Sequence, residues 1–211
     1  MNELVDDKTL KLILDKILTP RFGKLNFQWD GNTMWFNQLN NSIRQVFTYK
    51  KLKGETGTFS WGVCIDFVPT ISSNKLQFHK TEKSVKLHLF EWTDEYSNSF
   101  LGGNLDNGIT THWGRQEAEK SILKLIDKYE ERIFNWFKNS TTVEQLIDIA
   151  DKQIGNGKSY EIHSPNPRFV LAFLQAKSRQ LQTSYETIEK LLLEDELKEK
   201  IKMNLKKLSE Y

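Results

Sequence analysis

The segment TFSWGVCIDFVP, residues 58–69, constrains the fold of this chain more strongly than any other. Small or polar residues alternate in it with large apolar ones, which are Phe59, Trp61, Val63, Ile65 and Phe67. Because successive side chains of a β-strand point to opposite faces, this alternation predicts a half-buried strand whose apolar face packs on a core. The first part of the chain is therefore expected to contain a sheet.

Weaker alternation predicts three further strands, at about residues 33–39, 43–52 and 84–92. The connection KGETG that follows the second of these is short and polar and contains two glycines. The strands on either side of it are therefore expected to form an antiparallel hairpin. The longer segment 70–83 is either an exposed loop or holds a short strand around residues 76–79, and the pattern does not decide between the two.

A helix is predicted before these strands. Apolar residues recur every three or four positions from Leu10 to Ile17, after the acidic pair Asp6 and Asp7. Pro20 is expected to end this helix, because proline cannot continue the hydrogen-bond pattern.

Helical periodicity also dominates the last third of the chain. A continuous apolar stripe predicts a helix over residues 118–137, and a second helix follows with Thr141 or Thr142 as its cap. Pro167 suits the first turn of a third helix, and Ser184 can open a last one.

Strands followed by helices favour an α+β fold over alternating βαβ units. We expect an antiparallel sheet of about four to five strands, with an N-terminal helix and packed C-terminal helices. Residues 1–140 are predicted to form the α+β domain, and residues 141–211 a helical extension packed on it.

The charge balance argues against nucleic-acid and membrane partners. The chain has 30 basic and 28 acidic side chains, so its net charge is only +2, too little to create a large single-sign field. A basic sheet edge from the lysines of residues 48–53 and 75–86 is the alternative, although lysines on edge strands commonly serve to block aggregation. No segment reaches the roughly 18 apolar residues of a membrane span, and a single cysteine agrees with a cytoplasmic location.

Familiar catalytic, cofactor and metal motifs do not occur in the sequence. The segment GNGKS ends like a phosphate-binding loop, but Lys152 stands where that motif needs its first glycine. The four histidines do not have metal-ligand spacing, and Cys64 lies in the middle of a predicted strand. Asp66 and Glu91 lie in predicted strands and could form an acid/base pair, but each is more simply explained as facing solvent or pairing with a lysine. We expect no cofactor, no metal and no recognisable catalytic residue.

The stretch LGGNLDNGITTHWGRQEAEK, residues 101–120, is the candidate ligand-binding site. Its glycines allow sharp turns, and Thr110 or Thr111 can bond the free amides of a helix that begins near Trp113. Free amides at a helix start can also hold an anion, with His112 and Arg115 as further donors. The candidate site residues are Gly102, Gly103, His112, Trp113 and Arg115.

Phe22, Lys24, Phe27, Trp35 and the alternation in residues 59–67 resemble the bacterial domain-of-unknown-function family 4304. In that family a short helix leads to a phenylalanine and lysine segment, an aromatic strand and a second alternating strand. The resemblance covers at most residues 8–140 and leaves out the C-terminal helices. It implies an α+β domain, brings no catalytic residues, and points to an immunity-like or other protein-binding role.

Two classes of function fit these features. The first is a non-enzymatic interaction protein that holds another protein through an exposed sheet edge or through residues 101–115. The alternative is an enzyme or binder that acts on a small anionic ligand at the helix entrance, where His112 is the acid or base and Arg115 a further donor. The oligomeric state is left open.

Overall fold

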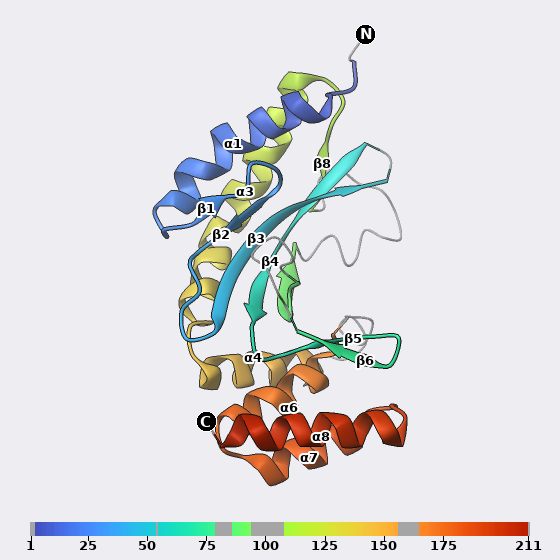
Figure 1. Cartoon of the computed structure of the whole chain (residues 1–211). Coiled ribbons are helices and arrows are strands. Elements are labelled where there is room, and N and C mark those ends of the chain that lie inside the picture. The colour runs from blue at the N-terminus through green and yellow to red at the C-terminus, as the bar shows by residue number, and fades with distance from the viewer. Residues whose placement is uncertain (1–2, 54, 79–85, 94–107, 156–164, 211) are drawn as a thin grey trace. The chain divides into compact units, whose positions relative to one another are not determined.

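The computed structural model describes residues 3–53, 55–78, 86–93, 108–155 and 165–210 (Figure 1). Its elements are one N-terminal helix, an antiparallel sheet, a small hairpin and the C-terminal helices. The predicted α+β class is confirmed. None of the helices in these ranges is long and apolar enough to cross a membrane.

The chain folds as two compact units that are interleaved in sequence. Unit 1 consists of Met1–Leu39, Arg44–Gly62 and Phe90–Lys138. Unit 2 consists of Asn40–Ile43, Val63–Leu89 and Asn139–Tyr211. The domain division at residue 140 stays a prediction.

Helix α1 spans Asp7–Gly23, and the side chain of Asp6 caps it by accepting a hydrogen bond from the Thr9 N–H at 2.9 Å. The expectation that Pro20 ends the helix is wrong. Pro20 and Lys16 are both exposed, so the carbonyl that loses its partner at Pro20 lies on the water-facing side. The helix continues for three residues after Pro20, and its last turn is anchored by Phe22, which is fully buried with its ring centroid 4.2 Å from that of Phe47.

The main sheet has the strand order β1-β2-β3-β4-β7, and β8 pairs with β4. The strands are β1 Gln28–Trp29, β2 Met34–Phe36, β3 Ile43–Leu52, β4 Thr56–Ile65, β7 Leu89–Trp92 and β8 Thr110–Thr111. The strand at 43–52 and its pairing with the alternating strand are confirmed. The strand predicted at 33–39 is shorter, and the one predicted at 84–92 begins only at Leu89, with 84–85 outside the described residues.

Strand β4 is buried on both faces, so the prediction of a half-buried strand is wrong. Trp61 is fully buried on the apolar face, but Ser60 on the other face is also fully buried. The reason lies in the neighbouring strands. The Nζ of Lys50 on β3 lies 5.2 Å from the ring centroid of Phe90 on β7, so long side chains from both neighbours meet above the small residues of β4.

The core of unit 1 is rich in aromatic residues and lies between the sheet and two helices, α1 and α3. Helix α3 spans Arg115–Lys138, as its apolar stripe predicts, and packs against α1 (Figure 1). The largest buried side chains of this core are Phe22, Trp35, Phe47, Tyr49, Phe59 and Trp61.

Unit 2 has a helical core centred on α6, Pro167–Lys177, which contacts α4, Val143–Gly155, and both later helices. All residues of α6 from Phe169 to Ala176 are buried. The predicted caps are confirmed: Thr142 Oγ1 accepts from the Gln145 N–H at 3.3 Å, and Pro167 is the first residue of its helix. Residues 70–83 contain the hairpin of β5, Thr70–Ser72, and β6, Lys75–Gln77, so the short strand is present.

The last predicted helix is in fact two, α7 Leu181–Glu189 and α8 Asp195–Ser209. Ser184 lies inside α7 rather than at its start. The break has a geometric cause. Ile188 and Leu197 are both buried, yet at about 100° per residue their separation of nine positions would place them on opposite sides of one continuous helix. Two helices allow both side chains to reach the core.

Candidate functional site

The segment predicted as a ligand site divides into an inward and an outward half. Strand β8 pairs with β4, with Thr110 opposite Gly57 and Thr111 opposite Thr56. Side chains alternate as in any strand: Thr110 is fully buried and His112 is 4% exposed, whereas Trp113 is 51% exposed. Gly102 and Gly103 lie outside the described residues.

The inward half forms a buried hydrogen-bonded cluster around Tyr49. The Tyr49 hydroxyl lies 2.7 Å from Nε2 of His112 and also hydrogen bonds the hydroxyl of Thr110. Gly57 makes room for it, because a Cβ at that position would lie 2.0 Å from the Tyr49 oxygen. The cluster thus joins β3, β4 and β8 at a point where no larger residue fits.

Burial disfavours the charged forms of His112 and Tyr49 in this cluster. It lowers the pKa of His112, with the nearby Lys51 ammonium adding to the effect, and it raises the pKa of Tyr49. The Tyr49 hydroxyl thus shares one hydrogen bond with His112 Nε2 and one with the Thr110 hydroxyl. The His112 ring is therefore engaged in structure, and its role as an acid or base stays a prediction.

The outward half presents Trp113 beside Leu4 of the N-terminal segment. These two residues form an isolated β-bridge, flanked by hydrogen bonds from Val5 N–H to His112 O at 2.9 Å and from Gly114 N–H to Glu3 O at 3.0 Å. Leu4 is 44% exposed. Two neighbouring apolar side chains are thus held at the surface by an ordered backbone.

The start of α3 completes this outward face. Thr111 Oγ1 accepts from the Trp113 N–H at 3.1 Å, as expected for a residue next to a helix start. Gly114 has φ +74°, which turns the chain into the helix. Arg115, the third described residue of the predicted site, is the first residue of α3 and is exposed.

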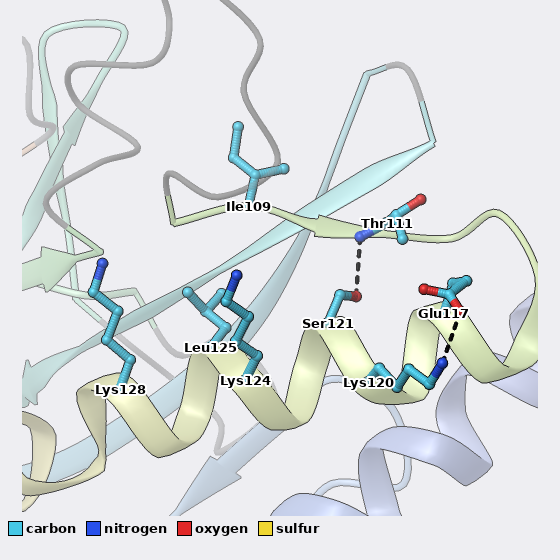
Figure 2. A pocket seen from close by; sticks show the side chains of 8 residues that line it. All are labelled: Ile109, Thr111, Glu117, Lys120, Ser121, Lys124, Leu125 and Lys128. Atoms are coloured by element: carbon cyan, nitrogen blue, oxygen red, sulfur yellow. Dashed lines mark hydrogen bonds and ion pairs between the residues drawn. The ribbon is translucent and has the colours of Figure 1, made fainter.

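A groove of about 230 Å³ lies beside this face, between residues 109–111 and α3. Its lining residues, all labelled in Figure 2, are Ile109, Thr111, Glu117, Lys120, Ser121, Lys124, Leu125 and Lys128. Ser121 Oγ accepts from the Thr111 N–H at 3.1 Å and so ties β8 to the helix. Lys124 and Lys128 extend from α3 on the same side in Figure 2, while Lys120 lies along the helix next to Glu117.

The lysines of the groove did not figure in the sequence-based site. Lys120, Lys124 and Lys128 are spaced four residues apart and are all exposed, so they form a line along one edge of α3. We call this line the lysine edge. The four-residue spacing of these lysines is visible in the sequence and could have been used to predict the lysine edge.

Other sequence candidates have structural explanations. Glu91 pairs with Arg132 at 2.8 Å, while Asp66 follows the end of β4 and is exposed. The thiol of Cys64 is buried within β4. Within the described ranges, no three His, Cys, Asp or Glu side chains gather as a metal-ligand set. Of the GNGKS segment only Gly155 is described, as the last residue of α4.

The basic sheet edge considered from the sequence is not formed by β3. That strand lies between β2 and β4 in the sheet order. Its Lys51 makes an ion pair with Asp7 of α1, and its Lys50 lies over the rings of β7.

No protein-family model, curated protein or solved structure matches this chain. The resemblance to the family of unknown function therefore stays a prediction.

Proposed function

We propose that this chain is a non-enzymatic protein-binding module whose binding face is the outward side of residues 109–115 together with the lysine edge of α3. The observation that carries the proposal is the half-exposed indole of Trp113 on an ordered backbone. Tryptophan is among the residues most enriched at the energetic centres of protein interfaces.

The neighbourhood of Trp113 fits an interface centre. Leu4 extends the apolar surface, and exposed charged residues, among them Glu3 and Arg115, surround it. An apolar centre with a charged rim is the usual anatomy of a protein interface. Covering the exposed half of the indole alone would contribute about 2 to 3 kcal/mol to binding.

The alternative, a site for a small anionic ligand that uses His112 and Arg115, has less support. His112 is buried in the Tyr49 cluster, and neither residue is among those that line the groove. An immunity-like role is a narrower form of the leading proposal, in which the partner is a toxin; a toxin gene beside this one would favour it.

The proposal is tested by affinity capture from cells of the source organism. The bait is the full chain as wild type, as Trp113→Ala, and as Met203→Ala, a matched control because Met203 is 63% exposed on α8. We expect one protein that is recovered in stoichiometric amount with the wild type and the control and is lost with Trp113→Ala. Capture of the same proteins by all three baits, or of none by any, contradicts the proposal.

The captured protein is then purified and mixed with the same three variants. Loss of the Trp113 contact is expected to weaken the reconstituted complex at least tenfold, as for a central interface residue. An affinity that Trp113→Ala leaves unchanged argues that binding occurs elsewhere on the chain.

A further inference from the structure

We infer that a second pocket, in unit 2, binds a small aliphatic anion: an alkyl chain that carries a carboxylate or phosphate head. The pocket has a volume of about 470 Å³, within the range of about 300 to 1,000 Å³ that is typical of small-molecule sites. All of its lining residues belong to unit 2, and none belongs to the face around Trp113. The inference therefore goes beyond the proposed function and can fail separately from it.

Three segments that lie far apart in the sequence form the walls of this pocket. They are β5 through Ile71, the start of α6 with the residues just before it, and the linker between α7 and α8 (Figure 1). The linker is ordered at both ends. The Leu191 N–H donates to the Ile188 carbonyl at 3.0 Å, and Glu194 Oε2 accepts from Asn74 Nδ2 of the β5–β6 turn at 2.8 Å. The fold of unit 2 thus holds the walls in place.

Most of the lining is apolar and aliphatic. Leu192 is fully exposed to solvent, and its neighbours Leu191 and Leu193 are partly exposed. Removal of such surface from water is the main driving force for binding an apolar group, so an alkyl chain is the complement of these walls. The apolar lining residues are Ile71, Pro165, Phe169, Leu191, Leu192 and Leu193.

The polar part of the lining is positively charged. It consists of Asn166, Arg168 and Lys190, so the nine lining residues include two cations and no acidic residue. Both cationic side chains are exposed, and within the described ranges neither makes an ion pair. The backbone N–H of Arg168 is already bonded to Asn166 Oδ1 at 2.8 Å. The two side chains, rather than the amides of the helix start, are therefore the groups that can hold an anion.

Acidic residues border the pocket but do not line it. Glu189 forms ion pairs with two lysines of α8, and Glu194 is bonded to the β5–β6 turn. Asp195 lies in the first turn of α8, where the helix dipole favours a carboxylate. Glu186 stands four residues before Lys190 on α7, and the two side chains do not form an ion pair. The charge of the lining itself is therefore positive.

The arrangement of charge and apolar surface specifies the ligand class. Arg168 lies on the α6 wall and Lys190 on the linker wall, and a guanidinium binds carboxylate and phosphate oxygens in pairs. A head group held by both would leave its alkyl chain to contact the leucines of the linker. A nucleotide fits less well, because bases are normally held by stacking on an aromatic face. The one ring in the lining, Phe169, is 2% exposed and packs on Phe173.

The test measures the binding of octanoate and octyl phosphate to the full chain by isothermal titration calorimetry at matched ionic strength. Octylammonium has the same alkyl chain with the opposite charge. Acetate and inorganic phosphate have the head groups without the chain. Comparison of these five probes shows whether both the charge and the chain are needed.

One variant removes the positive charge of the pocket. Arg168→Gln/Lys190→Gln replaces both cations. Lys206→Gln/Lys207→Gln removes the same charge from exposed positions on α8 and is the matched control. Circular dichroism confirms that each variant is folded.

A second variant shortens the apolar wall. Leu192→Ser should fold like the wild type, because a fully exposed side chain contributes little to stability. Met203→Ser, at a position 63% exposed on α8, is its control. Loss of affinity in Leu192→Ser therefore reports on the ligand rather than on the fold.

We expect the wild type to bind octanoate, octyl phosphate or both, and the tighter of the two to identify the head group. Octylammonium, acetate and inorganic phosphate should not bind in the same concentration range. Affinity should fall at least about fivefold in the charge variant and about threefold or more in Leu192→Ser, and change less than about twofold in the controls. In NMR spectra of the wild type, the alkyl anion should shift the amide signals of Arg168 and Leu191–Leu193. This result tests the inference even if the charge variant does not fold.

Several results would overturn the inference. They are no binding of either alkyl anion, equal binding of octylammonium, displacement by inorganic phosphate, or unchanged affinity in both pocket variants. Tighter binding of a tetrapeptide that ends in leucine would show that the pocket takes a protein terminus. A wild-type dimer that Leu192→Ser dissociates in sedimentation would show that a second copy covers the pocket. Trp113→Ala should leave the affinity for the alkyl anion unchanged, so failure of this inference is distinguishable from failure of the proposed function.

Discussion

Four consecutive residues, Thr110 to Trp113, show how differently neighbouring side chains of one candidate site are used. Thr110 and His112 are buried and hydrogen bonded to Tyr49, so they hold three strands together. Thr111 borders the lysine groove, and Trp113 is half exposed. Because successive side chains of a strand point to opposite faces, the residues that stabilise the fold lie on one face and the residues accessible to a partner lie on the other. Changes to the inward half should affect stability, and changes to the outward half should affect binding.

The largest expected effect is that of Gly57→Ala on the inward side. The added methyl group would lie 2.0 Å from the buried Tyr49 oxygen, and we expect the free energy of unfolding to fall by about 3 kcal/mol or more. Urea denaturation measures this loss. Gly23→Ala is the control, because nothing lies within 4 Å of its Cβ, and it should change stability by less than about 1 kcal/mol. Equal effects of the two substitutions would show that the Tyr49 cluster is not tightly packed.

Tyr49→Phe should have the next largest effect. It leaves the buried His112 Nε2 and the Thr110 hydroxyl without their shared partner, at a cost of about 1 to 3 kcal/mol. Tyr185→Phe, at a half-buried position in α7, is the matched control and should cost less than about 0.5 kcal/mol. Thermal unfolding of both variants provides the comparison, and a Tyr49→Phe protein as stable as wild type would contradict the role of the hydroxyl.

The pH dependence of stability should follow from the lowered pKa of His112. The unfolded chain takes up a proton near the ordinary histidine pKa of 6.5, while the folded chain resists protonation to a lower pH. Stability is therefore full above pH 6.5 and decreases as the pH falls toward the folded pKa. The quantity to measure is the difference in unfolding free energy between wild type and His112→Gln across this range, which isolates His112 from other groups. A difference that does not change with pH would contradict the assignment.

The smallest stability effects belong to the outward side. Trp113→Ala should lower the free energy of unfolding by less than about 1 kcal/mol, and Lys124→Gln/Lys128→Gln by less than about 0.5 kcal/mol. Both variants can be compared with wild type by thermal unfolding. A loss as large as that of Tyr49→Phe would mean that these side chains serve the fold and that the two halves do not differ.

Much of the fold follows from periodicity in the sequence. The alternation in residues 59–67 predicts β4, and the stripe from Ala118 to Phe137 predicts α3, because burial of one face imposes the period of each element. The predictions failed where packing against distant parts of the chain overrode a preference of the local sequence. Pro20 is tolerated inside α1 because it faces water. The break between α7 and α8 follows from the angle between Ile188 and Leu197 around a continuous helix, which a count of apolar positions does not show.

The candidate site was predictable in location but not in orientation. The sequence draws attention to His112, Trp113 and Arg115, yet a shift of one residue in a strand exchanges its two faces. Only the pairing of β8 with β4 shows that His112 faces inward. The groove could not be predicted from the sequence, because its two sides come from separate elements, β8 and α3, and only the folded chain brings them together. The four-residue spacing of the lysines alone does not show which element lies opposite them.

An NMR titration of the full chain with the captured partner tests the central claim most directly. The indole N–H signal of the half-exposed Trp113 is followed together with those of Trp35 and Trp61, which are fully buried. The account predicts that the partner shifts or broadens the Trp113 signal and leaves the Trp35 and Trp61 signals nearly unchanged. A Trp113 signal that the partner does not affect, or equal shifts of all three signals, would contradict it.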